Sequence, residues 1–121
     1  MRDDEPIIQP ATRDDWHAWL AEHHETADAV WVKLAKKASG IASPSYDESV
    51  EVALCFGWID GLSRGFDEHH RIQRFTPRRK RSNWSQRNRG RAEALIASGR
   101  MQPAGLREVD RAKEDGRWDA A

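Results

Sequence analysis

A chain of 121 residues can form one domain around one modest core, but it is too short for two. Its charged fraction is 33% and its apolar fraction 38%, and six tryptophans give the small core enough bulk to argue against a disordered chain. The formal net charge is zero and no stretch approaches the roughly 20 apolar residues that span a bilayer, so we expect a cytoplasmic protein.

The first 37 residues predict a strand, a helix and a second strand, and their acidic start, MRDDEPIIQP, argues against a signal peptide. Residues 6–12 predict a short strand, and Thr12 is the expected N-cap of the helix. One face of this helix has helical spacing and consists of Trp16, Trp19, Leu20 and His23. Residues 29–37 alternate, which predicts a strand with Val30, Val32 and Leu34 on one face and Trp31 and Lys33 on the other.

The central part of the chain predicts a helix that leads directly into a hairpin. Ser45 and Glu48 have the spacing of a capping box at the start of the helix. Gly57 is placed as its C′ residue, where glycine adopts a positive φ without strain. Two strands over 58–66 and 71–76 then predict an antiparallel hairpin.

Two further helices complete the predicted domain. The first is expected to be capped by Ser82 or Asn83 and to end at Gly99, and the second covers 103–115. Their apolar positions are Ala92, Leu95 and Ile96 in the first helix and Leu106, Val109 and Ala112 in the second. The order of elements favours an α+β fold in a single domain: a small, mainly antiparallel sheet of about four strands covered by about four helices.

Charge is unevenly distributed along the chain. Residues 1–60 contain five basic and twelve acidic residues, a net charge of −7, whereas residues 61–121 carry +7. Residues 71–91 contain nine basic residues and no acidic residue. Such asymmetry indicates either a face that binds polyanions or two halves that pack together and neutralise each other, and the second reading is the simpler one.

Three sequence motifs together resemble those of one family of small bacterial proteins. The motifs are YDESVEVALCFGWIDG at 46–61, RFTPRRKRSNWSQRN at 74–88 and GRMQPAGLREVDRAKEDGRW at 99–118. In this order they resemble the YdeI/OmpD-associated family. The resemblance extends from about Tyr46 to Trp118 and is weaker in the N-terminal third.

The resemblance implies one domain of this family over residues 1–121, linked to envelope stress and to protection against bacteriocins or cationic peptides. It implies no established catalytic reaction. Longer members continue into a further helical segment rich in basic residues. Because this sequence stops at Ala121, we expect a domain without that segment, and no role of the segment is carried over.

The segment TPRRKRSNWS at 76–85 is the strongest candidate for a binding site. Four consecutive basic residues precede an expected helix N-terminus, where the helix dipole disfavours cations and attracts anions. The anion could be a phosphate, a sulfate or a carboxylate, including a carboxylate of the protein itself such as Asp60. The candidate ligand-binding residues are Trp58, Asp60, Arg78, Lys80, Ser82, Trp84 and Asn88.

Several of these residues have a structural interpretation as well as a functional one. Asp60 either forms an ion pair with Arg78 or another cation, which would fix the hairpin to the next helix, or it belongs to the ligand pocket and is free for proton transfer. Trp58 and Trp84 either fill the core or stack on a base or a sugar. The structural interpretation is the simpler one in each case.

The sequence predicts no cofactor and no metal site. Cys55 is the only cysteine, which excludes an intramolecular disulfide, and its place at an apolar helix end predicts a buried and inert thiol. The histidine pairs 23–24 and 69–70 lack the spacing of known zinc motifs. We expect them on the surface or at the hairpin tip.

The favoured hypothesis is a non-enzymatic binding protein that recognises a small anionic ligand or polyanion through residues 76–88. One alternative is nucleic-acid binding by the basic stretch 71–91, which is weakened by the zero net charge and by the lack of a known nucleic-acid-binding motif. Another is an enzyme with Asp60 as general acid or base, which lacks a convincing titratable partner. The sequence does not indicate an oligomeric state.

Overall fold

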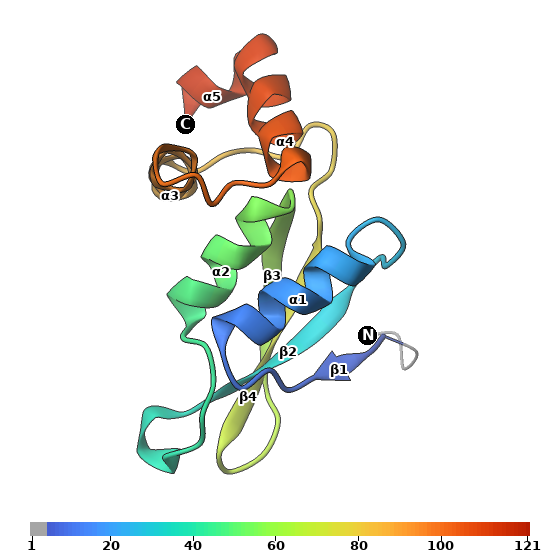
Figure 1. Ribbon diagram of the computed structural model, residues 1–121, viewed down its shortest axis with the longest axis vertical. Coiled ribbons are helices and arrows are strands. Elements are labelled where there is room, and N and C mark those ends of the chain that lie inside the picture. Colours follow the sequence, from blue (N-terminus) through green and yellow to red (C-terminus); the bar gives the residue numbers. More distant parts are fainter. Residues whose placement is uncertain (1–4) are drawn as a thin grey trace.

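Figure 1 shows the computed structural model, which describes residues 5–121. The strands in this range are β1 (Ile7–Ile8), β2 (Val30–Ala35), β3 (Trp58–Gly65) and β4 (His70–Pro77). The helices are α1 (Arg13–His23), α2 (Tyr46–Cys55), α3 (Gln86–Ala97), α4 (Pro103–Glu114) and α5 (Arg117–Ala120), with a short 3₁₀ helix at Lys37–Ser39. The predicted α+β fold in a single domain is confirmed.

The strands form one mixed sheet in the order β1-β2-β4-β3. β1 pairs with β2 in parallel, whereas β2 and β3 both pair with β4 antiparallel, so the sheet is mainly antiparallel as predicted. Val30 lies opposite Phe75, and both are fully buried on the face that the helices cover. On the other face the Trp31 indole donates to Glu5, whose carboxylate also accepts two bonds from Arg74.

Helices α1 and α2 lie side by side across one face of the sheet, as Figure 1 shows. Trp16 of α1 is fully buried, packs 5.2 Å from the Phe75 ring and donates its indole N–H to the Ser49 carbonyl at 3.0 Å. The N-cap at Thr12 and the capping box of α2 are both formed. These two helices therefore begin where the sequence predicts.

The C-terminal helices lie beyond one end of the sheet (Figure 1), and two glycines let α4 approach the end of α2. Gly57 follows α2 with φ of 74°, as predicted for its C′ residue. A Cβ atom on Gly105 would lie 2.5 Å from the Cys55 oxygen and 2.6 Å from the Leu54 oxygen. Because this space is filled by backbone, only glycine fits at position 105 without a shift of the two helices.

The start of α3 differs from the prediction. The N-cap is Ser85, whose hydroxyl accepts from the Asn88 N–H at 3.1 Å, and not Ser82 or Asn83. The basic run of the sequence therefore lies in the loop between β4 and α3, several residues before the helix, and does not adjoin its N-terminus. The cause is the buried Arg78, which holds Ser82 and Asn83 in the loop by hydrogen bonds.

The structure also corrects the apolar faces of the two C-terminal helices. Ile96 and Leu106, expected among the apolar positions, are each 38% exposed. In α4 the buried residues are Gly105, Val109 and Ala112. Gly105 faces α2 because only a residue without a side chain fits where the two helices meet. No helix among residues 5–121 is both long enough and apolar enough to cross a membrane.

Candidate functional site

Arg78 lies where β4 leaves the sheet, and its side chain is buried in a polar and aromatic setting. Its backbone N–H donates to the Gly57 carbonyl at 2.9 Å, which ties the loop to the end of α2. Its guanidinium donates from Nε to the Ser82 hydroxyl at 3.1 Å and from Nη2 to the Asn83 carbonyl at 2.8 Å. The same group stacks on the Trp84 ring, 4.0 Å from its centre. Only 7% of Arg78 remains exposed.

The charge of Arg78 has no close counterion. None of the ion pairs among residues 5–121 includes Arg78, and its Nη1 atom is buried without a hydrogen-bond partner. Burial lowers the pKa of Arg78 to about 10. The negative charge of Glu108 opposes this shift, and the positive charge of Arg117 adds to it. A buried cation in this state is costly, because an unpaired charge loses its hydration without a full replacement.

Arg78 also lines a cavity of about 290 Å³ between the hairpin and α4. The residues around it come from the end of α1, the end of α2, the two strands of the hairpin and the first turns of α4. They are His24, Glu25, Phe56, Gly57, Trp58, Pro77, Arg78, Ala104, Arg107 and Glu108. We call this space the Arg78 cavity. A smaller hollow of about 170 Å³ adjoins it and shares five of these residues: His24, Glu25, Phe56, Ala104 and Arg107.

The first turn of α4 gives this cavity a further means of attracting negative charge. It carries no acidic side chain, and the N-cap residue Gln102 makes no side-chain capping bond. The positive end of the helix dipole is therefore not neutralised by a local carboxylate. Glu108 lies one turn further on; its Oε2 atom accepts from Arg111 at 3.0 Å, but its Oε1 atom is buried without a partner.

His24 and Phe56 form the part of the cavity wall nearest α1. The Nδ1 atom of His24 lies 2.8 Å from the Leu20 carbonyl, so the proton is placed on Nδ1, as this contact requires. The imidazole ring packs 5.0 Å from the Phe56 ring. Phe56 also contacts His17 at 4.9 Å, so two histidines flank one buried phenylalanine.

The structure brings four of the seven predicted site residues together. Trp58 lines the same cavity as Arg78, and Ser82 and Trp84 hold the Arg78 side chain. Trp58 and Trp84 are 1% and 6% exposed, so both belong to the core. The structural interpretation of the two tryptophans is therefore the one that the fold favours.

The other three predicted residues lie elsewhere. Asp60 forms no ion pair with Arg78; its Oδ2 atom accepts from the Tyr46 hydroxyl at 2.5 Å, because the strand pairing places Asp60 opposite Phe75, on the face that carries α2. Lys80 is exposed in the loop. Asn88 belongs to α3, where its amide oxygen accepts from Arg91. These three residues therefore do not share one pocket with Arg78, contrary to the functional interpretation of the sequence.

Several residues of the Arg78 cavity were absent from the sequence prediction, namely His24, Glu25, Arg107 and Glu108. They come from the two positions after α1 and from α4, which meet the hairpin only through the tertiary fold. One local signal could have pointed to α4. The sequence QPAG at 102–105 places a proline at the first helical position and a glycine shortly after it, which indicates a helix start that another backbone approaches closely.

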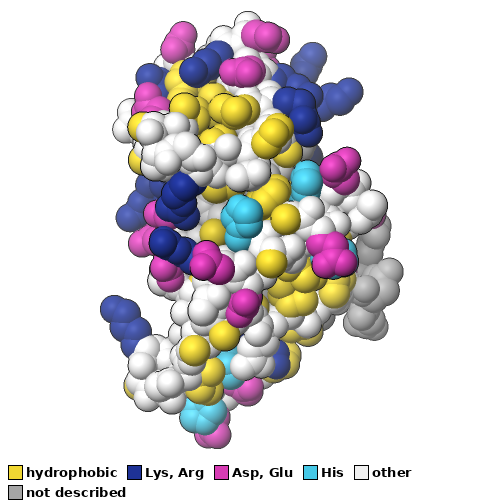
Figure 2. All heavy atoms as spheres, viewed as in Figure 1, with side chains coloured by type: hydrophobic (Ala, Val, Ile, Leu, Met, Phe, Trp, Pro, Cys, Tyr) yellow, Lys and Arg dark blue, Asp and Glu magenta, His cyan; other side chains and the backbone are white. Residues whose placement is uncertain are grey.

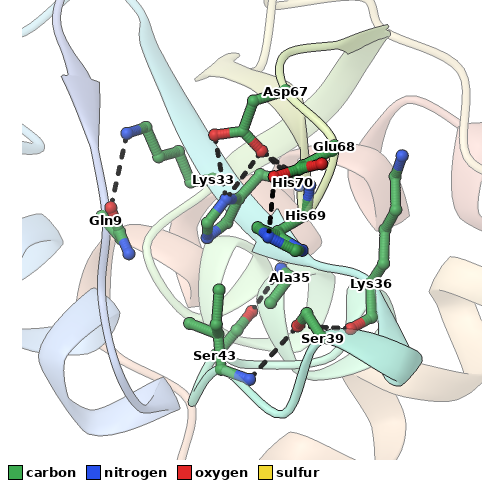
Figure 3. Close-up of polar contacts among 11 residues, drawn as sticks. Gln9, Lys33, Ala35, Lys36, Ser39, Ser43, Asp67, Glu68, His69 and His70 are labelled. Carbon is green, nitrogen blue, oxygen red and sulfur yellow. Dashed lines mark hydrogen bonds and ion pairs between the residues drawn. The ribbon is translucent and has the colours of Figure 1, made fainter.

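Other reactive groups of the chain lie outside this cavity. Cys55 is 1% exposed, as predicted, and burial raises the pKa of its thiol to about 11. Figure 3 shows the hairpin tip, where His69 contacts Glu68 and the His70 ring contacts Asp67 at 3.1 Å. His70 lies at the hairpin tip, one of the two predicted placements, but its side chain is buried there and only 6% exposed. Within residues 5–121, no group of three or more His, Cys, Asp and Glu side chains could hold a metal ion.

Comparison with known proteins assigns the chain to a family. The model of a family described as a domain of unknown function, DUF8412, matches residues 8–108. The chain belongs to the DUF8412 family. The matched range contains every residue that lines the Arg78 cavity and ends at Glu108, so the cavity lies wholly within the DUF8412 domain. No curated protein and no solved structure matches the chain.

Proposed function

We propose that this protein is a non-enzymatic binding protein that holds a small ligand by an anionic group in the Arg78 cavity. The observation that carries the proposal is the buried guanidinium of Arg78, which has an unpartnered Nη1 atom and, among residues 5–121, no carboxylate in an ion pair with it. A bound anion would supply the missing counterion. Arg107 and the uncapped start of α4 add to the attraction at the same cavity.

This proposal keeps Arg78 from the sequence hypothesis but moves the site away from the basic run. Arg79, Lys80 and Arg81 are exposed in the loop and do not line the cavity. Figure 2 shows basic, acidic and histidine side chains mixed over the visible face of the molecule, with no broad area of a single charge. A small ligand in a cavity fits this mixed distribution better than a long polyanion on the surface does.

The two alternative functions receive less support from the geometry. Stacking on a nucleic-acid base needs an exposed aromatic face, whereas Trp58 and Trp84 are buried. Asp60, the candidate general acid or base, does not line the Arg78 cavity, and its carboxylate accepts from Tyr46. The link to envelope stress or cationic-peptide protection rests on the motif resemblance to the YdeI/OmpD-associated family, and together with a cytoplasmic location it stays a prediction.

Titration of the protein with sodium acetate and with sodium phosphate at low ionic strength tests the proposal. The expected result is saturable binding that changes tryptophan fluorescence, because Trp58 lines the cavity and Trp84 stacks on Arg78. Arg107→Gln should weaken binding, and Arg79→Gln, which removes an exposed arginine outside the cavity, should not. Binding that is lost equally in both variants, or the absence of binding to any carboxylate or phosphate, would contradict the proposal.

A further inference from the structure

Two residues that line the Arg78 cavity each have one buried side-chain atom without a hydrogen-bond partner, a donor in Arg78 and an acceptor in Glu108. These atoms are Arg78 Nη1 and Glu108 Oε1. A simple anion would satisfy Arg78 and leave Glu108 unpaired. A simple cation would do the reverse. Only a ligand with both an acceptor and a donor group satisfies the two together.

The charges around the cavity are balanced in the same way. Two arginines, Arg78 and Arg107, and two glutamates, Glu25 and Glu108, line it. A dianion would meet repulsion from both glutamates, whereas a molecule with one negative and one positive group finds an opposite charge for each. The balance therefore selects for a zwitterion.

The positions of these charges also suggest an orientation for such a molecule. The negative group belongs beside Arg78 and the first turn of α4, which has no acidic side chain. The positive group belongs beside Glu108, whose free Oε1 atom can accept a charged hydrogen bond. Phe56, Pro77 and Ala104 also line the cavity and provide apolar wall for the uncharged side chain of the ligand.

We infer that the ligand class is a free α-amino acid, which carries a carboxylate and an ammonium group on one carbon atom. This inference rests on the proposed function and names its ligand. The cavity of about 290 Å³ lies at the lower end of the range for small-molecule sites, which suits a single amino acid. A water molecule that bridges Arg78 and Glu108 is the competing explanation for the two unmet groups.

The first experiment compares amino acids with blocked derivatives. Each of the twenty L-amino acids is added to ¹⁵N-labelled protein, and the indole N–H signal of Trp84, which stacks on Arg78, reports on the site. At least one amino acid should bind, and its N-acetyl and carboxamide derivatives should each bind at least about tenfold more weakly, because each loses one charged hydrogen bond. If none of the twenty binds, the inference is overturned and a bridging water is the better account.

The same comparison separates failure of the inference from failure of the proposed function. If the N-acetyl derivative binds as tightly as the free amino acid, the anion site stands and the zwitterion is wrong. If acetate and phosphate bind but no amino acid does, the conclusion is the same. If no carboxylate or phosphate of any kind binds, the proposed function itself fails.

Two substitutions assign the charges to their residues. Glu108→Gln should weaken binding of the free amino acid about tenfold and leave binding of the N-acetyl derivative unchanged, since only the ammonium contact is lost. Arg107→Gln, at an exposed position, should weaken binding of both ligands. Arg79→Gln serves as the matched control. Equal weakening of both ligands by Glu108→Gln would contradict the assigned ammonium contact. The Trp84 indole signal in each variant without ligand confirms that the site is folded.

Discussion

The sheet with α1 and α2 is held together differently from the region that follows β4. In the first, apolar side chains such as Val30 and Phe75 are fully buried, and both helices begin at well-formed caps. In the second, arginines lie over tryptophan rings: Arg78 over Trp84 at 4.0 Å and Arg89 over Trp118 at 5.4 Å. In the first region the helix starts follow local sequence rules, whereas in the second the buried side chain of Arg78 decides where α3 begins.

The two regions also differ in how well their polar groups are satisfied. Five side-chain polar atoms of residues 5–121 are buried without a partner, and four of them lie between positions 78 and 117. They are Arg78 Nη1, Trp84 Nε1, Glu108 Oε1 and Arg117 Nη2. Unsatisfied buried groups are rare in native proteins and gather where a ligand or water completes the structure. The concentration of unsatisfied groups after β4 therefore supports the proposal that a ligand binds at the Arg78 cavity.

The junction between the two regions should be the most sensitive part of the molecule. Gly105→Ala is expected to cost about 3 kcal/mol or more of unfolding free energy, because overpacking against rigid backbone forces the elements apart. The new Cβ atom would meet the Cys55 and Leu54 oxygens at 2.5 and 2.6 Å. Urea denaturation measures the effect.

Gly90→Ala is the matched control for this substitution. Gly90 lies within α3, and a Cβ atom there would have no heavy atom within 4 Å. The change should raise stability by about 0.5–1 kcal/mol, since alanine is the better helix former. If Gly105→Ala proved as harmless as Gly90→Ala, the close contact of α2 and α4 would not exist as described.

Gly57→Ala should cost about 1–3 kcal/mol, the second largest effect, through a strained positive φ and a tight contact. Gly57 has φ of 74°, and its new Cβ atom would lie 3.0 Å from the Ala104 oxygen. Gly116→Ala is the comparison, because Gly116 has a similar φ of 85° but an added Cβ atom there would have no heavy atom within 4 Å. The difference between the two variants in thermal unfolding isolates the junction contact, and equal losses would show that only backbone strain matters.

The sequence predicted the first region well because its signals are local. Thr12 and the Ser45–Glu48 pair cap their helices within three residues, and the alternation of 29–37 gives β2 its two faces. The C-terminal region gave fewer such signals. Ser82 and Ser85 are both good N-cap residues, and what decides between them is the buried Arg78, a residue outside the helix.

The candidate site was predicted less well for the same physical reason. Arg78 was found because a basic run is visible in the sequence, but three of its neighbours in the cavity, His24, Arg107 and Glu108, lie up to 54 positions away along the chain. For Asp60 the sequence predicts either an ion pair with Arg78 or another cation, or a place in the ligand pocket. The strand register instead brings Asp60 to Tyr46, and nothing in the sequence fixes that register to a single residue.

Asp60→Asn tests that pairing and should have a moderate effect, about 1–2 kcal/mol, because it weakens one hydrogen bond to a charged acceptor. The pKa of Tyr46 is raised by burial and by this bond, so the phenol keeps its proton and remains the donor. A double-mutant cycle with Tyr46→Phe should show coupling, since the two side chains touch at 2.5 Å.

The corresponding cycle of Asp60→Asn with Arg78→Met separates the two regions. No ion pair joins these residues, and Asp60 is the weakest of the four influences on the pKa of Arg78, so the two costs should add within about 0.5 kcal/mol. Strong coupling of the two unfolding free energies in chemical denaturation would show that Asp60 interacts with Arg78. The sheet and the region after β4 would then not be energetically separate.

Cys55 lies at the junction itself, and its effect on stability should be the smallest, limited to alkaline pH. Burial raises the pKa of its thiol from 9.0 to about 11, and the charge of Arg100 opposes the shift. The unfolded chain releases the thiol proton first, so the stabilising contribution is complete below about pH 8.5 and is lost as pH rises through 11. The unfolding free energy of the protein, minus that of Cys55→Ala, should therefore fall between pH 9 and 11. The opposite shift of Arg78 is present in both proteins and cancels in this difference. A difference that stays constant over this range would mean that the thiol is open to solvent and that the joint between α2 and α4 is looser than its backbone contacts indicate.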